Sequence, residues 1–352
     1  MDKAHRRRFG PEFVAAQREK YGHRQPQGRM LSYDLAVEDR YEPWRAWLDE
    51  QLALLPEREA EAFAANLGRD QNFWPYNIEL AAGAALRERG FTVEYERRWG
   101  TLTPDWTVTD AAGAPIALVE VLTHSPPKAM FSRMRDWHEL AQRVREIPVP
   151  VVLTVAGHPD RPLDPPVDAR AAKQIAQALR RWLLSPLDLV SFTSHGYTFR
   201  IMADHRTGGP IQAPFLGAVL EAPSQMAGVV SAQPLAAVGI KEKLHKYRDL
   251  AQEASLPLIL AAGSHRFTGL TVRHFDDLLS GANTVSVQFG YGDTFIHPPI
   301  EVQPGRPRRW AMPPDLAGVL WIDHDNFPSF TTHWRPNSQA LRPAPAPFTP
   351  GH

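Results

Sequence analysis

The sequence predicts an α/β fold built around a mixed sheet. Two kinds of strand pattern occur among amphipathic helical patterns: short alternating strands joined by tight turns, and continuous apolar runs at 148–156 and 256–262. Continuous runs are typical of strands buried on both faces, whereas strands joined by a tight turn pair antiparallel. Because both kinds alternate with helices, we expect parallel and antiparallel strands together in a chain of 352 residues, long enough for one large domain or two ordinary ones.

The first 70 residues are expected to form a basic arm followed by helices. Residues 1–30 contain eight Lys or Arg and three Asp or Glu, with little apolar periodicity. The arm is either a solvated segment or a segment that contacts phosphates. Residues 41–55 place apolar side chains at helical spacing, and residues 57–67 continue as a second helix after Pro56.

A core region is expected from 71 to 282, and its first elements are local and well marked. A helix over 76–89 ends at Gly90, a common position for a glycine at the carboxyl end of a helix. An alternating strand over 91–97 follows it.

The next two strands form a hairpin, and its pairing is the most informative local feature. If the hairpin turns at 112–113, Trp106 lies opposite Val119 and Asp105 lies opposite Glu120. Side chains that face each other across an antiparallel pair are about 5 Å apart, and like charges there are destabilising. A shared divalent cation is the most useful explanation for two carboxylates in this relation.

The later elements follow from the same patterns. Further helices are expected at 130–147, within 166–184, at 238–253 and at 271–279, and further strands at 218–222, at 315–322 and in a hairpin over 188–203 that turns at His195 and Gly196. The core is expected to carry an insertion near 157–237. A strand-containing extension at 283–341 and a disordered, proline-rich tail at 342–352 are expected to follow it.

Composition excludes several classes of function. Lys and Arg together number 39, as do Asp and Glu, so no global basic field indicates a nucleic-acid partner. The absence of cysteine excludes disulfides, thiolate zinc sites and a cysteine nucleophile, and is in keeping with a cytoplasmic protein. The sequence has no signal peptide, membrane span, zinc-hydrolase HExxH, serine-hydrolase elbow or phosphate-binding glycine loop.

Three acidic residues form the candidate site. Glu79 lies mid-helix on a face of apolar and small residues, Asp105 starts a strand, and Glu120 lies inside an apolar strand, where an unpaired carboxylate is costly. The order of helix with Glu, strand, strand starting Pro-Asp and strand with Glu resembles the core of the PD-(D/E)XK nuclease superfamily, the restriction-endonuclease-like fold. The resemblance implies an αβββαβ core in which Asp105, Glu120 and Glu79 hold Mg²⁺ or Mn²⁺. The metal would activate a water that attacks a phosphodiester of DNA.

The lysine that this motif places two residues after Glu120 is replaced by Leu122. Such a lysine would hold the attacking water and stabilise negative charge in the transition state. Lys243 and Lys246, on one face of the helix at 238–253, are the candidates to replace it. This helix is similar to a K-x-x-K-Y helix that precedes a buried strand in uncharacterised bacterial proteins with the same nuclease core.

The leading hypothesis is a metal-dependent nuclease-like protein that hydrolyses phosphodiester bonds in DNA. Leu122 favours an alternative, a catalytically inactive nuclease-fold protein that binds nucleic acid or a protein partner. The zero net charge favours a third, an interaction protein without a nucleic-acid role. Each carboxylate also has an ordinary interpretation: Asp105 as a turn residue, Glu120 on the solvated side of an edge strand, and Glu79 as a helix-surface charge. The expected partner is DNA and not a membrane, and a homodimer is one open oligomeric state.

Overall fold

The protein has a mixed α/β fold, as predicted, with a six-stranded and a four-stranded sheet. The computed structural model describes residues 7–21, 35–36, 38–125, 128–156, 163–185, 190–206, 217–221, 232–264, 268, 270–281, 309–326 and 328–348. In this part of the chain no helix combines the length and the apolar character needed to cross a bilayer.

The six-stranded sheet contains both parallel and antiparallel pairs. In spatial order its strands are β1 (Thr92–Tyr95), β2 (Trp106–Thr109), β3 (Pro115–His124), β8 (Leu258–Ser264), β9 (Leu316–Asn326) and β10 (Ser329–Pro336). β3, β8 and β9 run parallel, and the pairs β1–β2, β2–β3 and β9–β10 are antiparallel. Every residue of β8 is buried because the strand lies between β3 and β9 and is covered on both faces, which explains its continuous apolar sequence.

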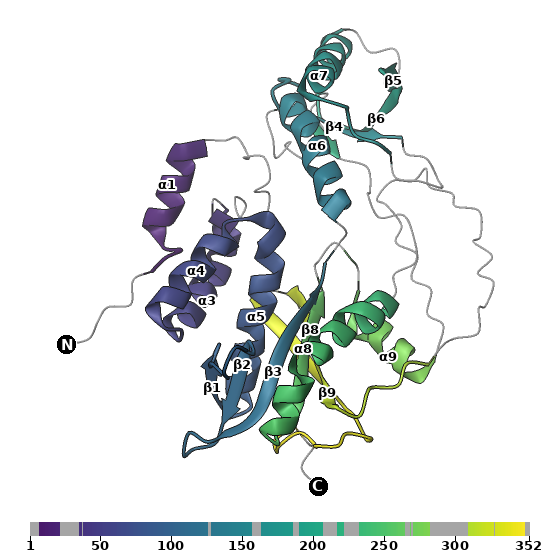
Figure 1. Ribbon diagram of the computed structural model, residues 1–352. Coiled ribbons are helices and arrows are strands. Elements are labelled where there is room, and N and C mark those ends of the chain that lie inside the picture. Colours follow the sequence, from purple (N-terminus) through teal and green to yellow (C-terminus); the bar gives the residue numbers. More distant parts are fainter. Residues whose placement is uncertain are drawn as a thin grey trace.

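Helices cover the two faces of this sheet (Figure 1). On one side lie α3 (Glu42–Ala53), α4 (Glu57–Leu67) and α5 (Asp70–Glu88), and on the other lie the π-helical η2 (Leu235–Ile240), α8 (Lys241–Glu253) and α9 (Val272–Ser280). Successive residues of β3 alternate between these two cores: Val119 and Val121 pack with the α5 side, and Leu118 packs with the α8 side. Glu120 therefore lies on the α8 side of the sheet.

Helix α5 begins earlier than the predicted helix over 76–89. It starts at Asp70 and carries Pro75 inside it, a residue that usually marks a helix start or break. Phe73 and Trp74, on the preceding turn, are buried in the core. Their burial holds this turn in helical conformation across the proline.

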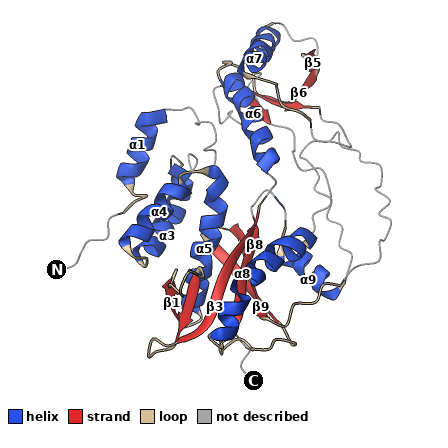
Figure 2. Cartoon of the chain, viewed as in Figure 1, coloured by secondary structure: helices blue, strands red, loops and turns tan. Residues whose placement is uncertain are grey.

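The part of the chain that follows β3 and precedes η2 forms a separate unit, here called the inserted unit (Figure 2). This unit has its own hydrophobic core. It comprises α6 (Lys128–Arg145), β4 (Val151–Val155), α7 (Ala169–Leu184), β5 (Ser191–Ser194), β6 (Tyr197–Asp204) and β7 (Val219–Glu221). Its strand order is β5-β6-β4-β7. The predicted insertion near 157–237 therefore starts too late, because β4 pairs with β6 and β7 rather than with the six-stranded sheet.

The described part of the basic arm is folded against acidic residues. It forms helix α1 (Pro11–Tyr21), and the Arg18 guanidinium lies 3.2 Å from Asp39. Arg8 pairs with Glu57 at 2.7 Å and donates its backbone N–H to Asp49. Two of the arm's cations are thus engaged within the protein.

The prediction of a disordered tail at 342–352 is wrong for its described part, which ends at Phe348. Phe348 is buried and stacks on Phe91 with ring centroids 5.0 Å apart. It also contacts Trp334 of β10, a strand that the sequence patterns did not predict. Proline content indicated disorder, but two aromatic partners far away in sequence bury the end of this segment.

Candidate functional site

The carboxylate hairpin has the predicted register. Trp106 pairs with Val119, and the ladder places Asp105 next to Glu120 at the point where β2 begins. The backbone N–H of Asp105 donates to Glu120 Oε2 at 3.3 Å, and that of Val121 donates to Asp105 Oδ2 at 2.6 Å. Each carboxylate is thus anchored on the backbone of the opposite strand.

Burial separates Glu120 from its ordinary interpretation. Glu120 is fully buried, and β3 is an interior strand, so it is not a carboxylate on a solvated edge. Asp105 is more open, with 19% of its side chain exposed. The pair therefore has a buried member and a member that solvent reaches, as a site that admits a ligand from one side requires.

Lys243 brings a cation to this pair from the other layer. Its Nζ lies 2.5 Å from Glu120 Oε1 and 4.0 Å from Asp105 Oδ2. Burial lowers the pKa of the Lys243 ammonium, but the two facing carboxylates outweigh burial and leave its pKa above the ordinary value. Lys243 is therefore a charged partner at neutral pH.

Leu122 of β3 positions the helix that carries Lys243. Leu122 packs against Gly239, where an added Cβ would lie 2.8 Å from the Leu122 side chain. Gly239 and Lys243 are four residues apart on the continuous helix η2–α8, and Leu122 and Glu120 are two apart on one face of β3. The contact at Leu122 thus places the next helical turn over Glu120.

Tyr247 extends the same helix face by one more turn. Its hydroxyl donates to the carbonyl oxygen of Thr103 at 2.9 Å, just before Asp105 in the chain. Burial and the nearby Glu120 and Asp105 carboxylates raise the pKa of Tyr247 above its ordinary range, so its hydroxyl stays protonated as a donor. The aromatic residue of the K-x-x-K-Y segment therefore supports the loop that leads into the hairpin.

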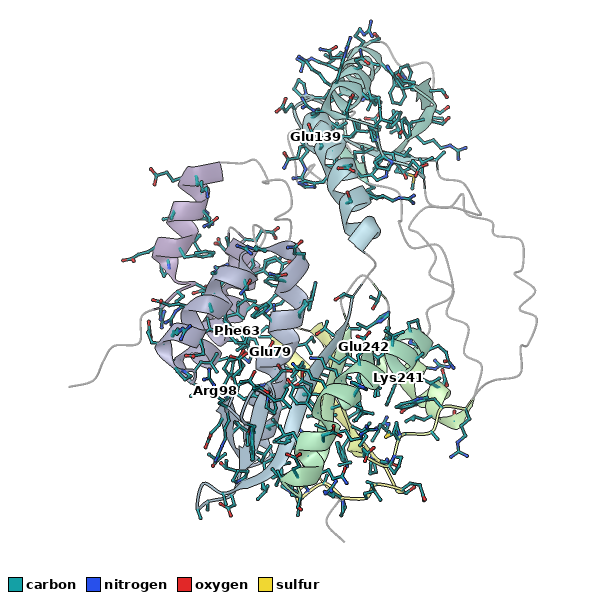
Figure 3. All side chains as sticks on the ribbon, in the orientation of Figure 1. Phe63, Glu79, Arg98, Glu139, Lys241 and Glu242 are labelled. Carbon is teal, nitrogen blue, oxygen red and sulfur yellow. The ribbon has the colours of Figure 1, made fainter. Side chains whose placement is uncertain are left out.

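Lys246, the second predicted lysine, does not join the carboxylates in this arrangement. It is exposed, and its ammonium lies 4.6 Å from the ring centroid of Tyr247. Lys241 is also exposed at the start of α8, where Figure 3 labels it together with Glu242. Of the three lysines on this helix, Lys243 is the one with an ion pair to Asp105 and Glu120.

Glu79 lies close to the pair but is oriented by a different partner. Its carboxylate accepts a 2.8 Å hydrogen bond from the Tyr95 hydroxyl, and the Trp106 indole donates to its backbone carbonyl. Gly83, one turn later, lets the Trp106 ring pack directly on α5, since an added Cβ would lie 2.4 Å from that ring. Glu79, labelled in Figure 3, is therefore held on the α5 side. Lys243 reaches Glu120 from α8, on the other side of the sheet.

Burial and charge repulsion raise the pKa values of two carboxyls in this cluster. Burial, followed by the Asp105 charge, raises the pKa of Glu79 to about 8. Burial, followed by the Glu120 charge, raises the pKa of Asp105 to about 7, although Lys243 opposes the rise. Both pKa values lie at or above neutral pH, and a bound cation, which favours the ionised form of a carboxyl, would lower them.

The donor set fits Mg²⁺ with two protein ligands rather than three. No group of three or more His, Asp or Glu side chains in the described part of the chain is arranged to hold a metal. Asp105 and Glu120 alone supply adjacent carboxylate oxygens on one side of the sheet. Mg²⁺ is commonly held by one or two carboxylates, with waters and substrate phosphates as its other ligands, so this pair suffices chemically.

Tyr95 and Glu96 lie beside Glu79 in the candidate site, although the sequence did not predict them there. Glu96 has a positive φ of 44°, unusual for a residue with a side chain, and its backbone N–H donates to the Asp105 carbonyl. Its charge also contributes to the raised pKa of Glu79. No sequence pattern signals either residue, because both become relevant only when β1 pairs with β2.

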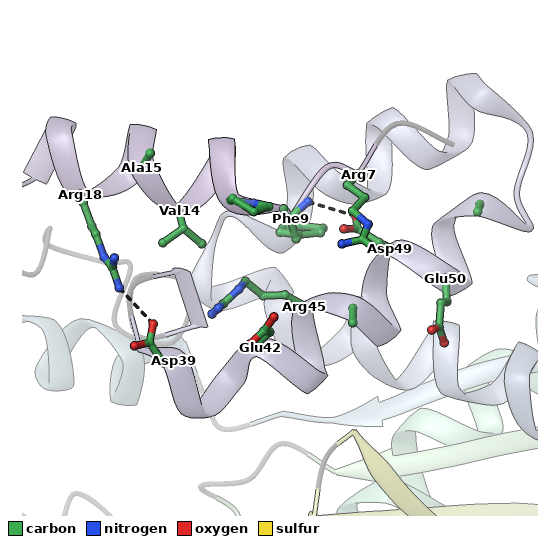
Figure 4. Close-up of a pocket in the computed structure, with 14 residues that line it drawn as sticks. Arg7, Phe9, Val14, Ala15, Arg18, Asp39, Glu42, Arg45, Asp49 and Glu50 are labelled. Atoms are coloured by element: carbon green, nitrogen blue, oxygen red, sulfur yellow. Dashed lines mark hydrogen bonds and ion pairs between the residues drawn. The ribbon is translucent and has the colours of Figure 1, made fainter. Parts of the chain in front are cut away.

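One cavity stands apart from these carboxylates. About 760 Å³ in volume, it lies between α1 and α3 and is lined by Phe9, Val14, Arg18, Arg45 and Asp49 among others (Figure 4). Arg45 is buried there, and its guanidinium donates to the carbonyl oxygens of Leu35 and Glu38. No residue of the carboxylate hairpin lines this cavity.

Without divalent cations, the free energy of unfolding is expected to fall as the pH rises from about 4 to about 8. The raised pKa values of Asp105 and Glu79 mean that the folded state binds these protons more tightly than the unfolded chain, whose carboxyls titrate near pH 4. This stability is complete below pH ~4 and is lost as the pH passes about 7 to 8.

Urea titrations at about pH 5 and about pH 8.5 measure this dependence. Asp105→Asn cannot ionise and is expected to flatten it, whereas Asp249→Asn on the exposed face of α8 serves as the control. Equal pH dependence in wild type and Asp105→Asn would contradict the raised pKa of Asp105.

Comparisons with protein-family models, with curated proteins and with solved structures find no match for this chain.

Proposed function

We propose that this protein hydrolyses phosphodiester bonds in DNA at a Mg²⁺ site formed by Asp105 and Glu120. The observation that carries the proposal is the Lys243 ammonium, 2.5 Å from Glu120 and 4.0 Å from Asp105. Two adjacent carboxylates with one lysine are the functional groups of PD-(D/E)XK nucleases. The helix α5, the strands β1–β3, the helix α8 and the strand β8 supply elements in the order of an αβββαβ core.

Each side chain has a definite task in this proposal. Asp105 and Glu120 would hold Mg²⁺, which when bound lowers the pKa of a water and offsets charge on the phosphate. Lys243 holds the attacking water and faces the negative charge that builds on the phosphoryl oxygens. Glu79, oriented by Tyr95, would contribute negative charge from α5 and draw the cation toward Asp105 once it ionises, which its pKa of about 8 places above neutral pH.

Cleavage of supercoiled plasmid and of single-stranded DNA, with Mg²⁺ or Mn²⁺ and with a chelator, tests this proposal. Wild type is expected to cleave only with the metal, and Asp105→Ala is expected to lose cleavage because it removes an anchored oxygen ligand. Asp110→Ala, in the exposed turn of the same hairpin, is a control for effects on hairpin folding. No cleavage by wild type with either metal, or equal cleavage by Asp105→Ala, would reject catalysis.

The second candidate is a nuclease-fold protein that binds nucleic acid or a protein partner without cleaving. Two observations favour it: Lys243 already pairs directly with Glu120, and Glu79 accepts a hydrogen bond from Tyr95 rather than joining the pair. In that case DNA binding would persist in a chelator, would weaken steeply with salt and would survive Asp105→Ala. Metal-dependent cleavage lost in Asp105→Ala would exclude this second candidate.

A further inference from the structure

Helix α7 of the inserted unit carries a basic face. Its 16 residues include four Lys or Arg and no Asp or Glu. The four cations, here called the α7 basic face, are Arg170, Lys173, Arg180 and Arg181, and all four are exposed. At 100° per residue they fall within an arc of about 100°, so they project from one side of the helix.

The opposite side of α7 explains why this face is free to bind. Ile175, Leu179 and Leu183 are buried in the core of the inserted unit, where they pack with α6 and the four-stranded sheet. The helix is therefore fixed by its apolar side. Its basic side faces outward.

The α7 basic face has no acidic partner among the described residues. Within the described ranges, no ion pair joins any of its four cations to a carboxylate, and Arg180 donates a side-chain hydrogen bond to the backbone carbonyl of Glu146 at 3.4 Å. By contrast, Arg8 and Arg18 of the N-terminal arm pair with Glu57 and Asp39. Within the described part of the chain, α7 thus presents four exposed cations without a carboxylate partner on one helix face.

We infer that the α7 basic face contacts the phosphate backbone of duplex DNA and so holds the polymer while the carboxylate site acts. This inference rests on the proposed function for its choice of DNA. From Arg170 to Arg181 the helix extends about 16 Å, and duplex DNA carries one negative charge per about 1.7 Å of its axis, so the face spans several phosphates. Arginine, three of the four residues, matches phosphate geometry with two parallel N–H donors.

An anionic membrane surface would offer the same charge but fits this helix less well. A helix that lies on a membrane inserts an apolar face between the lipids. The apolar side of α7 is buried in the core of the inserted unit, and Leu184, within the arc of the basic face, is the one large exposed apolar residue of this helix. Charge complementarity without an available apolar face favours a polyanion in water.

The test measures binding of the full chain to a duplex of about 30 base pairs by fluorescence anisotropy over a range of salt concentrations. All proteins carry Asp105→Asn so that cleavage cannot interfere. The basic-face variant changes the four residues to glutamine, which keeps helix propensity. The control variant changes four exposed arginines elsewhere to glutamine: Arg58, Arg69, Arg248 and Arg273.

The basic-face variant is expected to bind roughly tenfold or more weakly near 0.15 M salt, with a log–log salt slope smaller by about 3 to 4, while the control variant changes the slope by less than 1. Equal slopes for the two variants would overturn the inference, provided that both keep the circular dichroism and melting temperature of the parent. Binding to anionic vesicles but not to DNA, lost in the basic-face variant, would also overturn it.

Failure of this inference can be told from failure of the proposed function. If the protein does not cleave, the salt slopes of the Asp105→Asn proteins still report whether α7 binds DNA. If the slopes are equal, metal-dependent cleavage by the otherwise unchanged chain still stands.

Discussion

Replacing Lys243 with methionine is expected to lower metal-dependent DNA cleavage by about 10²–10³-fold, the usual loss when one electrostatic donor is removed from a transition state. Methionine keeps the length and apolar stem of the side chain but removes the ammonium that lies 2.5 Å from Glu120. Single-turnover cleavage rates at saturating Mg²⁺ measure the effect.

Lys246→Met is the matched control, because Lys246 lies three residues later on the same helix and contacts Tyr247 rather than the carboxylates. It is expected to change the rate less than about threefold, with any effect coming from DNA binding. The salt slope for binding is expected to be nearly the same in both variants. Equal rates for Lys243→Met and wild type would remove Lys243 from the mechanism, and a loss in Lys246→Met alone would assign the role to the other lysine.

A change in folding must be separated from a change in chemistry for Lys243→Met. The ammonium lowers the pKa of Asp105, so its removal strengthens repulsion between Asp105 and Glu120 at high pH. Lys243→Met is therefore also expected to be less stable above about pH 7, and the rates should be compared where both proteins remain folded. A rate defect that persists there belongs to catalysis.

Phe348→Ala is expected to destabilise the protein by about 3 kcal/mol, as truncation of a buried aromatic side chain usually does. Phe348 is 3% exposed and lies against Phe91 at 5.0 Å and Trp334 at 4.8 Å, measured between ring centroids. Urea unfolding followed by tryptophan fluorescence measures the loss.

Leu341→Ala is the control, since Leu341 is an apolar residue nearby that is 67% exposed. It is expected to change stability by less than about 0.5 kcal/mol. If Phe348→Ala were as mild as Leu341→Ala, the end of the chain would not be part of the core, and the sequence-based expectation of a disordered tail would be restored.

The elements that the sequence predicted well are those governed by local patterns. β8 and α7 were expected from a continuous apolar run and from helical spacing, and both form close to those limits. The turn of the β5–β6 hairpin was expected at His195 and Gly196, and both have the positive φ that a tight hairpin turn requires. Turn chemistry and periodicity act over a few residues, so they can be inferred without knowing the rest of the fold.

Elements that depend on distant partners were predicted less well. β10 has no strong alternating pattern, and it forms by antiparallel pairing with the edge of β9. The predicted helix over 76–89 begins too late. Burial of Phe73 and Trp74 outweighs the tendency of the proline that follows them to break a helix. Propensity is a weak guide where tertiary burial supplies more free energy than the local preference.

For the candidate site, the sequence by itself determined that Asp105 and Glu120 are neighbours, since strand pairing and a turn at 112–113 set the register. Only the tertiary structure decided which lysine faces them, because Lys243 is 123 residues from Glu120 in the chain. The position of Lys243 depends on the packing of Leu122 against Gly239. The tertiary structure also decided that the Glu79 carboxylate accepts a hydrogen bond from Tyr95 on the α5 side of the sheet. A hairpin forms from residues that are close in the chain, so its register follows from the sequence. The Lys243 ammonium reaches the carboxylates only because helix α8 packs on the sheet.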